Sequence, residues 1–146
     1  MDEVIRAFNG HRVRYLLIGG QAMRLEGMPR FSMDWDLYIP PLDLENIALI
    51  NELLDETLDI PLVPRGEHGE NFIQTYQTEW GILQFHLGGA GLPRFDRADN
   101  RAVVRKNENG TPFRCMCTED LLASKKAANR PIDKEDILFL EAKLSR

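Results

Sequence analysis

The sequence contains only two cysteines, Cys115 and Cys117, which are separated by one residue. In a strand, two such thiols point to the same face and leave no room for a disulfide of normal geometry. Two thiolates alone also do not complete a zinc site. The composition therefore argues against a disulfide-stapled scaffold and against a zinc module, and we expect two small, partly buried thiols.

The sequence also lacks a long apolar run and an excess of positive charge. No stretch approaches the length of a membrane span, and the first residues do not show a signal-peptide pattern, so we expect a cytoplasmic protein without a membrane partner. Lys and Arg number 18 against 23 Asp and Glu, which leaves a net charge of -5. Bulk charge therefore gives no support for nucleic-acid binding, although a local basic patch could still serve.

The remaining composition is that of an ordinary globular domain. The chain has 146 residues, 43% of them hydrophobic, which is enough for one domain with its own core. Apolar periodicity and turn signals predict the element boundaries. We expect helices over 2–10, 21–26 and 44–54, from 118 and from about 133, and strands over 13–18, 33–39, 71–77, 81–87, 102–106 and 111–117. This order predicts an α/β (α+β) fold, a mixed sheet flanked by helices in a single domain of residues 1–146.

Two carboxylates interrupt the apolar stretch RFSMDWDLYIP. In a strand, Asp34 and Asp36 share one face at roughly 6.5 Å along the chain, while Met33, Trp35 and Leu37 pack on the other. Neighbouring carboxylates repel each other unless a cation lies between them, and Mg²⁺ commonly takes one or two carboxylates plus substrate phosphates. The alternative is a pair of ordinary strand-edge aspartates in water, which the apolar flanks disfavour.

The strand before this motif ends at Gly19-Gly20, just ahead of a short helix. A strand–glycine–helix turn lets the backbone approach a phosphate and presents free N–H groups. The stretch is neither a Walker loop nor G-x-G-x-x-G, and many loops contain two glycines. Its meaning therefore depends on the motif that follows it.

The order of these motifs resembles the signature of the polymerase-β-type nucleotidyltransferases. That signature has an apolar strand ending in G-G or G-S, a spacer of about this length, and D-x-D in the next strand. Here the corresponding letters are IGG and DWD. Arg30, Ser32, Asp34 and Asp36 are similar to the R-x-T-x-D-x-D of the small AbiEii-like branch. The segment EDLLASKKAANRPIDKEDILFL resembles the branch's second motif, so the resemblance runs from residue 13 to residue 140 and covers nearly the whole chain.

The resemblance implies an enzyme that uses Mg²⁺ or Mn²⁺ to move a nucleotidyl group from a nucleoside triphosphate to a hydroxyl acceptor. The acceptor is unknown and could be an RNA end, a protein or a small molecule, with a connection to toxin–antitoxin systems. The alternatives are a non-catalytic relative, kept for nucleotide sensing or as a protein partner, and a plain metal-binding or interaction domain. The implied site residues are Asp34 and Asp36 as catalytic metal ligands, and Gly19, Gly20, Arg30, Ser32 and Lys125 as nucleotide-binding residues.

Lys125 falls on the apolar stripe of its helix, where an ammonium group needs a carboxylate or a phosphate as partner. It can grip phosphate, pair with Asp136, or extend past the edge of the core. For Arg30, phosphate binding and simple surface exposure are both open. Asp133 and Asp136 fall at the start of the last helix, Asp133 as a natural N-cap, and we expect both, with Arg130, to order the fold.

The chain departs from the family pattern at the third carboxylate. In the family this group comes from a later strand and is expected to activate the attacking hydroxyl. The corresponding strand here is GILQFHL, whose polar face carries Gln84 and His86 but no Asp or Glu. His86 could act as a base or ligand near neutral pH, or be merely structural, whereas Gln84 could only orient. The sequence therefore predicts nucleotide binding and leaves catalysis open.

Overall fold

The computed structural model describes all residues, 1–146, and its framework is one six-stranded sheet in the order β3-β4-β2-β1-β6-β5. β2 lies near the middle, parallel to β4 and antiparallel to β1, so the sheet is mixed as predicted. The strands are β1 (Leu16–Ile18), β2 (Asp34–Tyr38), β3 (Ile73–Thr78), β4 (Gly81–His86), β5 (Val103–Lys106) and β6 (Pro112–Cys115).

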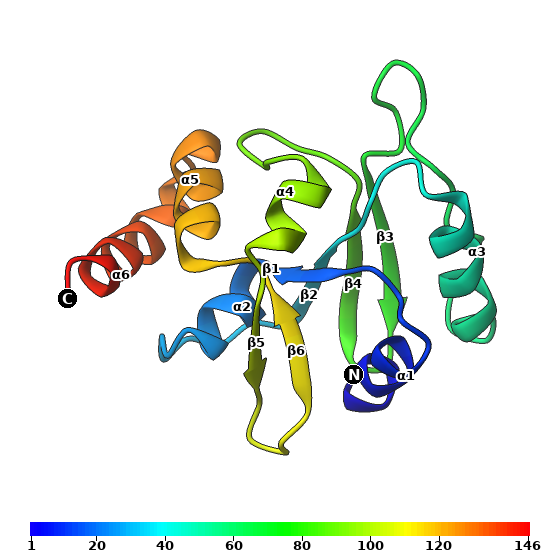
Figure 1. The fold of residues 1–146 in the computed structure, drawn as a ribbon, viewed down its shortest axis with the longest axis horizontal. Coiled ribbons are helices and arrows are strands. Elements are labelled where there is room, and N and C mark those ends of the chain that lie inside the picture. Colours follow the sequence, from blue (N-terminus) through cyan, green and yellow to red (C-terminus); the bar gives the residue numbers. More distant parts are fainter.

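Six α-helices and one short 3₁₀ turn surround the sheet. Figure 1 shows α5 and α6 packed together at the end of the molecule that holds the C-terminus, with α1 and α3 toward the opposite end. The longest helices have 11 residues, and none combines the length and apolar character needed to cross a membrane. The helices are α1 (Asp2–Gly10), α2 (Gly19–Leu25), α3 (Leu44–Leu53), α4 (Phe95–Asn100), α5 (Thr118–Ala128) and α6 (Lys134–Leu144), with η1 (Pro131–Asp133) before the last.

Apolar packing covers both faces of β2. The Tyr38 ring meets Phe95 of α4 edge-on at a centroid distance of 5.3 Å, and Trp35 stacks on Phe113 of β6 at 6.0 Å. Successive side chains of a strand point to opposite faces, so these two contacts lie on opposite sides of the sheet. β1 is buried at all three positions, as expected for a central strand with an unbroken apolar sequence.

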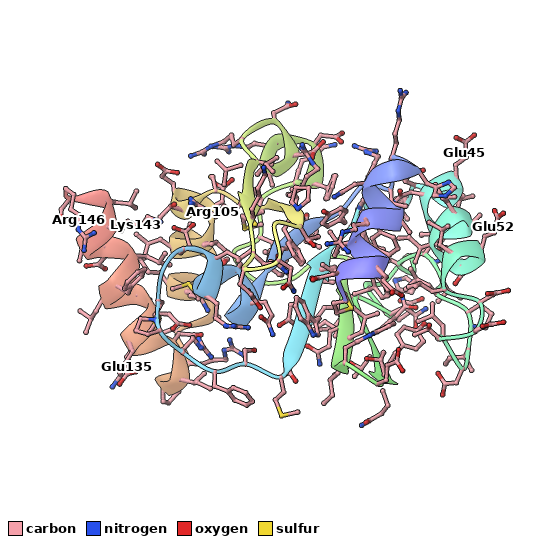
Figure 2. All side chains as sticks on the ribbon, turned by 90° about the horizontal axis from the view of Figure 1, so that it is seen from below. Glu45, Glu52, Arg105, Glu135, Lys143 and Arg146 are labelled. Carbon is pink, nitrogen blue, oxygen red and sulfur yellow. The ribbon has the colours of Figure 1, made fainter.

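The buried carboxylate of Glu26, just after α2, connects four elements. It accepts hydrogen bonds from Thr118 of α5 at 3.0 Å and Arg105 of β5 at 3.4 Å, and it forms an ion pair with Lys143 of α6. Figure 2 shows Arg105 and Lys143 on the same side of the molecule, while Glu45 and Glu52 of α3 project outward at the far end. A buried carboxylate is tolerated when it is paired, so this network fixes α5 and α6 against α2.

The structure confirms the four strands predicted between residues 71 and 117, which pair as the hairpins β3–β4 and β5–β6, and the start of α5 at Thr118. Several details of the prediction are wrong. The first strand begins at Leu16 rather than at residue 13. Met33 does not pack on the apolar face, since it precedes β2 and is 60% exposed. Asp2 is the first residue of α1, and its carboxylate accepts hydrogen bonds from the side chains of Asn107 and Asn109.

α4 has no counterpart in the sequence prediction. It has six residues and buries only Phe95 and Ala98, so its local pattern is too short to be recognised, and tertiary contact with Tyr38 supports it. The two cysteines do not share a strand face, because Cys117 lies beyond β6 as the N-cap residue of α5. Both thiols are free and fully buried rather than partly buried.

Candidate functional site

A cleft of about 540 Å³ lies between one face of β2 and β4, the start of α2, and the wall formed by α5 and η1. Segments from five parts of the chain meet there. All eight residues that the sequence singles out line this one cleft: Gly19, Gly20, Arg30, Ser32, Asp34, Asp36, His86 and Lys125.

Gly19 lies directly against the carboxylate of Asp36. β1 pairs with β2 so that Ile18 is opposite Asp36, and the next residue, Gly19, begins α2 with a φ of +72°. A Cβ atom added to Gly19 would lie 2.4 Å from Asp36 Oδ2, and one added to Gly20 would lie 2.6 Å from Ser32 Oγ. Only glycine fits both the backbone conformation and the space at position 19. The glycines belong to the first turn of α2, whereas the sequence predicts that this helix begins at residue 21.

Asp34 and Asp36 project into the cleft from the same face of β2, as predicted. Asp36 Oδ1 lies 2.8 Å from Nε2 of His86 on the neighbouring strand, whereas the side chain of Asp34 has no hydrogen bond or ion pair within the protein. A carboxylate accepts hydrogen bonds, so the His86 tautomer that fits this contact has its proton on Nε2. The lone pair of a neutral His86 is then on Nδ1.

The donor set of this pair fits a hard divalent cation that also binds phosphate. No group of three or more His, Cys, Asp or Glu side chains is arranged to hold a metal ion by itself. An unpaired carboxylate beside a second one nevertheless favours a cation between them. Mg²⁺ or Mn²⁺ would take Asp34 and Asp36 and complete its shell with water and substrate phosphates.

A cluster of ion pairs around the buried side chains of Lys125, Asp133 and Asp136 forms the opposite wall. Lys125 Nζ lies 2.8 Å from Asp136 Oδ2 and 3.7 Å from Asp133 Oδ1. Arg30 Nη1 donates to the same Asp136 oxygen at 2.5 Å, and Arg130 Nε donates to Asp133 at 2.9 Å. Of the three alternatives for Lys125, pairing with Asp136 is confirmed and extension past the core is wrong. Three cations against two carboxylates leave this wall with one net positive charge, which suits a phosphate.

The charges within the cluster influence each other's protonation. Burial alone would raise the pKa of Asp133, but hydrogen bonds from Arg130 and the nearby Lys125 outweigh it and hold that pKa below its ordinary value of 3.8. The hydrogen bond to Asp133 raises the pKa of Arg130 in turn. Asp133 orders the fold as predicted but not as a side-chain N-cap of α6, since its carboxylate is bound to Arg130.

Gln84 and His86 occupy the part of β4 that faces the carboxylates. Gln84 is paired in register with Asp36, but its amide lies 3.3 Å from Thr75 Oγ1 on β3. His86 is two residues further along and reaches Asp36. Glu79, the nearest acidic residue in the hairpin turn, lines a different cleft. The two carboxylates of β2 therefore have no third carboxylate beside them on β4.

Three exposed apolar side chains of the cleft carry no signal in the sequence: Phe72 just before β3, Ile73 at its start, and Ile132 of η1. Nothing local distinguishes them from other surface residues, because their common feature is that they face one cleft. Gly88-Gly89, which follows β4 after Leu87, also lines it. This pair could have been noticed, since it repeats the strand–glycine–glycine pattern of residues 18–20.

Neither a protein-family model nor a curated protein sequence matches this chain. Solved structures do match it. The crystal structure of ANT(2'')-Ia in complex with adenylyl-2''-tobramycin superposes with a TM-score of 0.61 at 16% identity, over 98% of this chain and 86% of that one. The solution structure of the same antibiotic-resistance factor gives 0.59 at 17%, over 97% and 80%.

The lincomycin-bound lincosamide antibiotic adenylyltransferase LnuA superposes with a TM-score of 0.59 at 19% identity, over 95% of this chain and 92% of that one. Structural similarity at such low sequence identity is evidence about the fold alone. They show that this chain has a nucleotidyltransferase fold, as its two motifs predict. The AbiEii-like branch stays a prediction of the sequence.

Proposed function

We propose that this protein is a nucleotidyltransferase that binds a nucleoside triphosphate with Mg²⁺ or Mn²⁺ and transfers a nucleotidyl group to a hydroxyl acceptor. The observation that carries this proposal is the fit of Gly19 against Asp36, with the unpaired Asp34 beside it. This places the start of a helix next to two carboxylates in one cleft. Two proteins with similar folds support the same class of reaction: ANT(2'')-Ia, which is bound to adenylyl-2''-tobramycin, and the adenylyltransferase LnuA.

In the proposed reaction, the acceptor oxygen attacks the α-phosphorus and forms a new P–O bond. The bond from that phosphorus to the bridging oxygen breaks, and pyrophosphate leaves with the bonding electrons. The acceptor's proton goes to water or to Nδ1 of His86, the ring nitrogen that Asp36 does not engage. Asp34 and Asp36 would hold the cation, which offsets charge on the phosphates.

The remaining cleft residues would bind the triphosphate. Lys125 and Arg30 supply positive charge from the wall opposite the carboxylates. Gly19 and Gly20 allow the phosphates to approach the backbone, and Ser32 fills the space beside Gly20. Together these groups would hold the α-phosphorus between the cation and the acceptor.

The first test is metal-dependent nucleotide binding. At about 100 times its dissociation constant, a nucleotide that binds only the folded state adds about 2.7 kcal/mol of stability, roughly 5–10 °C in Tm for this size. We expect Asp34→Asn and Asp36→Asn each to remove most of the part of that shift that depends on Mg²⁺. Differential scanning fluorimetry measures the effect, with Asp55→Asn, at an exposed position outside the cleft, as the matched control.

An unchanged metal-dependent shift in both cleft variants would contradict the proposed site. Incubation with each labelled triphosphate, Mg²⁺ or Mn²⁺, and total RNA and protein then identifies the acceptor class by the labelled species. A connection to toxin–antitoxin systems rests on the AbiEii-like motifs alone.

A second candidate function is nucleotide binding without transfer, for sensing or for binding another protein. The observation that favours it is the absence of a third carboxylate at Gln84 and His86. We expect a binder of this kind to gain transfer activity from Gln84→Asp or His86→Asp, while an enzyme that uses His86 loses activity on His86→Ala. Transfer assays with labelled triphosphate distinguish the two. If none of these variants changes binding or transfer, the side chains of β4 take no part in either.

A further inference from the structure

The acidic groups of the cleft are all committed to partners or to the proposed cation. Asp133 and Asp136 are buried and paired with Arg130, Lys125 and Arg30. The other two acidic side chains that line the cleft are Asp34 and Asp36, the proposed ligands of the cation. No carboxylate of the cleft lining therefore remains for ammonium groups of an acceptor.

The parts of the cleft that remain free are apolar or neutral. Phe72 is 47% exposed and Ile132 is 66% exposed, and they come from the two sides of the cleft, the β3–β4 side and η1. The Phe72 carbonyl accepts a hydrogen bond from Leu87 N at 2.7 Å, so its backbone is fixed at the end of the hairpin. Gln84 also lines the cleft, on β4 between β3 and Asp36 of β2, and its amide can hydrogen-bond a hydroxyl.

From this arrangement we infer that the acceptor is a neutral, partly apolar hydroxyl compound and that the cleft does not accept polycations. The inference rests on the proposed function and names its substrate class. The acceptor's apolar part packs between Phe72 and Ile132, and its hydroxyl points toward the α-phosphorus. The hydroxyl oxygen forms the new bond to phosphorus, pyrophosphate leaves, and the hydroxyl proton passes to water or His86. This specificity differs from that of ANT(2'')-Ia, whose bound product is adenylyl-2''-tobramycin, because tobramycin carries several ammonium groups.

The test compares two probes on the full chain with Mg²⁺ and a non-hydrolysable triphosphate analogue. n-Butyl glucoside is neutral and partly apolar, and tobramycin is a polycation. By saturation-transfer NMR we expect n-butyl glucoside to bind, and Phe72→Ala and Ile132→Ala each to weaken it about fivefold. The matched controls Phe31→Ala and Ile60→Ala, which truncate the same residue types at sites 82% and 66% exposed outside this cleft, leave binding unchanged.

A gain of binding provides the complementary test. Phe72→Glu places a carboxylate at the edge of the cleft, and we expect it to raise tobramycin affinity about tenfold while it weakens n-butyl glucoside. The inference is overturned if tobramycin binds the unmodified chain more tightly than n-butyl glucoside, or if Phe72→Ala and Ile132→Ala have no effect. Loss of metal-dependent nucleotide binding is a separate result, because it contradicts the proposed function itself.

Discussion

At the scale of single residues, the site depends on atoms that are absent as much as on groups that are present. Gly19 has no side chain, so Asp36 can lie against the first turn of α2. The same contact explains why the chain places a carboxylate in an otherwise apolar strand. Asp36 is held between a glycine on one side and His86 on the other, and the side chain of Asp34 has no partner within the protein.

We therefore expect Gly19→Ala to be more damaging than backbone strain alone predicts. Its positive φ disfavours alanine by about 1 kcal/mol, and overlap with Asp36 adds about 2 kcal/mol more. Gly110→Ala is the matched control, because Gly110 has nearly the same φ, +77° against +72°, but no atom near its missing Cβ. Urea unfolding measures both variants, and equal losses of stability would mean that Asp36 moves aside without cost.

At the scale of elements, two ion pairs connect α5 to α6 in different environments. Lys125 and Asp136 are buried beside the cleft, whereas Lys126 and Glu141 meet at 3.2 Å on the surface. Breaking a buried pair leaves an uncompensated charge, but an exposed pair is stabilised little by its partner. The same two helices therefore allow a buried ion pair to be compared with an exposed one.

We expect Lys125→Met to lower the free energy of unfolding by about 3 kcal/mol, and Lys126→Met by less than about 0.5 kcal/mol. In the double variant Lys125→Met/Asp136→Leu, only part of the stability should return, because the buried carboxylate is gone but Arg30 loses the partner that it keeps in the single variant. Triphosphate binding should stay weak in both Lys125 variants if this ammonium group also contacts phosphate. Urea unfolding and calorimetric titration with nucleotide separate the roles, and full nucleotide affinity in the double variant would assign Lys125 to the fold alone.

At the scale of the whole molecule, the sheet and its helices leave both thiols inside the core. Burial raises the pKa of Cys115 to about 12 and raises the pKa of Cys117 as well. The thiolate is the form that attacks a thiol reagent, so both cysteines are protected by their raised pKa and by their burial. Their reactivity reports opening of the structure around the end of β6, between β1 and β5, and the start of α5.

We accordingly expect Ellman's reagent at pH 8 to label neither cysteine rapidly in the native protein. Labelling should follow unfolding, with a rate that rises as urea approaches the midpoint and two thiols counted per chain at the end. Cys115→Ser and Cys117→Ser assign the two signals separately. Immediate reaction of either thiol in native buffer would show that the region around the end of β6 opens without global unfolding.

The sequence by itself determined the elements and the local chemistry of this protein. Alternating and helical apolar patterns, turn residues and the two motifs predicted the hairpins, the mixed sheet and α5, because these features depend on near neighbours in the chain. The same local reasoning identified Asp34 and Asp36 as sharing a face and Lys125 as needing a partner. It failed where burial depends on distant segments, as at Met33, which precedes β2, and in the six-residue α4.

Only the tertiary structure decided which partners these groups have. His86 reaches Asp36 across 50 positions, and Arg30 reaches Asp136 across 106. Contacts between residues so far apart in the sequence depend on strand order and helix packing, which no local pattern specifies. The same holds for Phe72 and Ile132, whose common cleft exists only because β4 pairs with β2 while α5 and η1 close the other side. The chain's composition supplied the chemical groups, and the packing of the sheet brought them together.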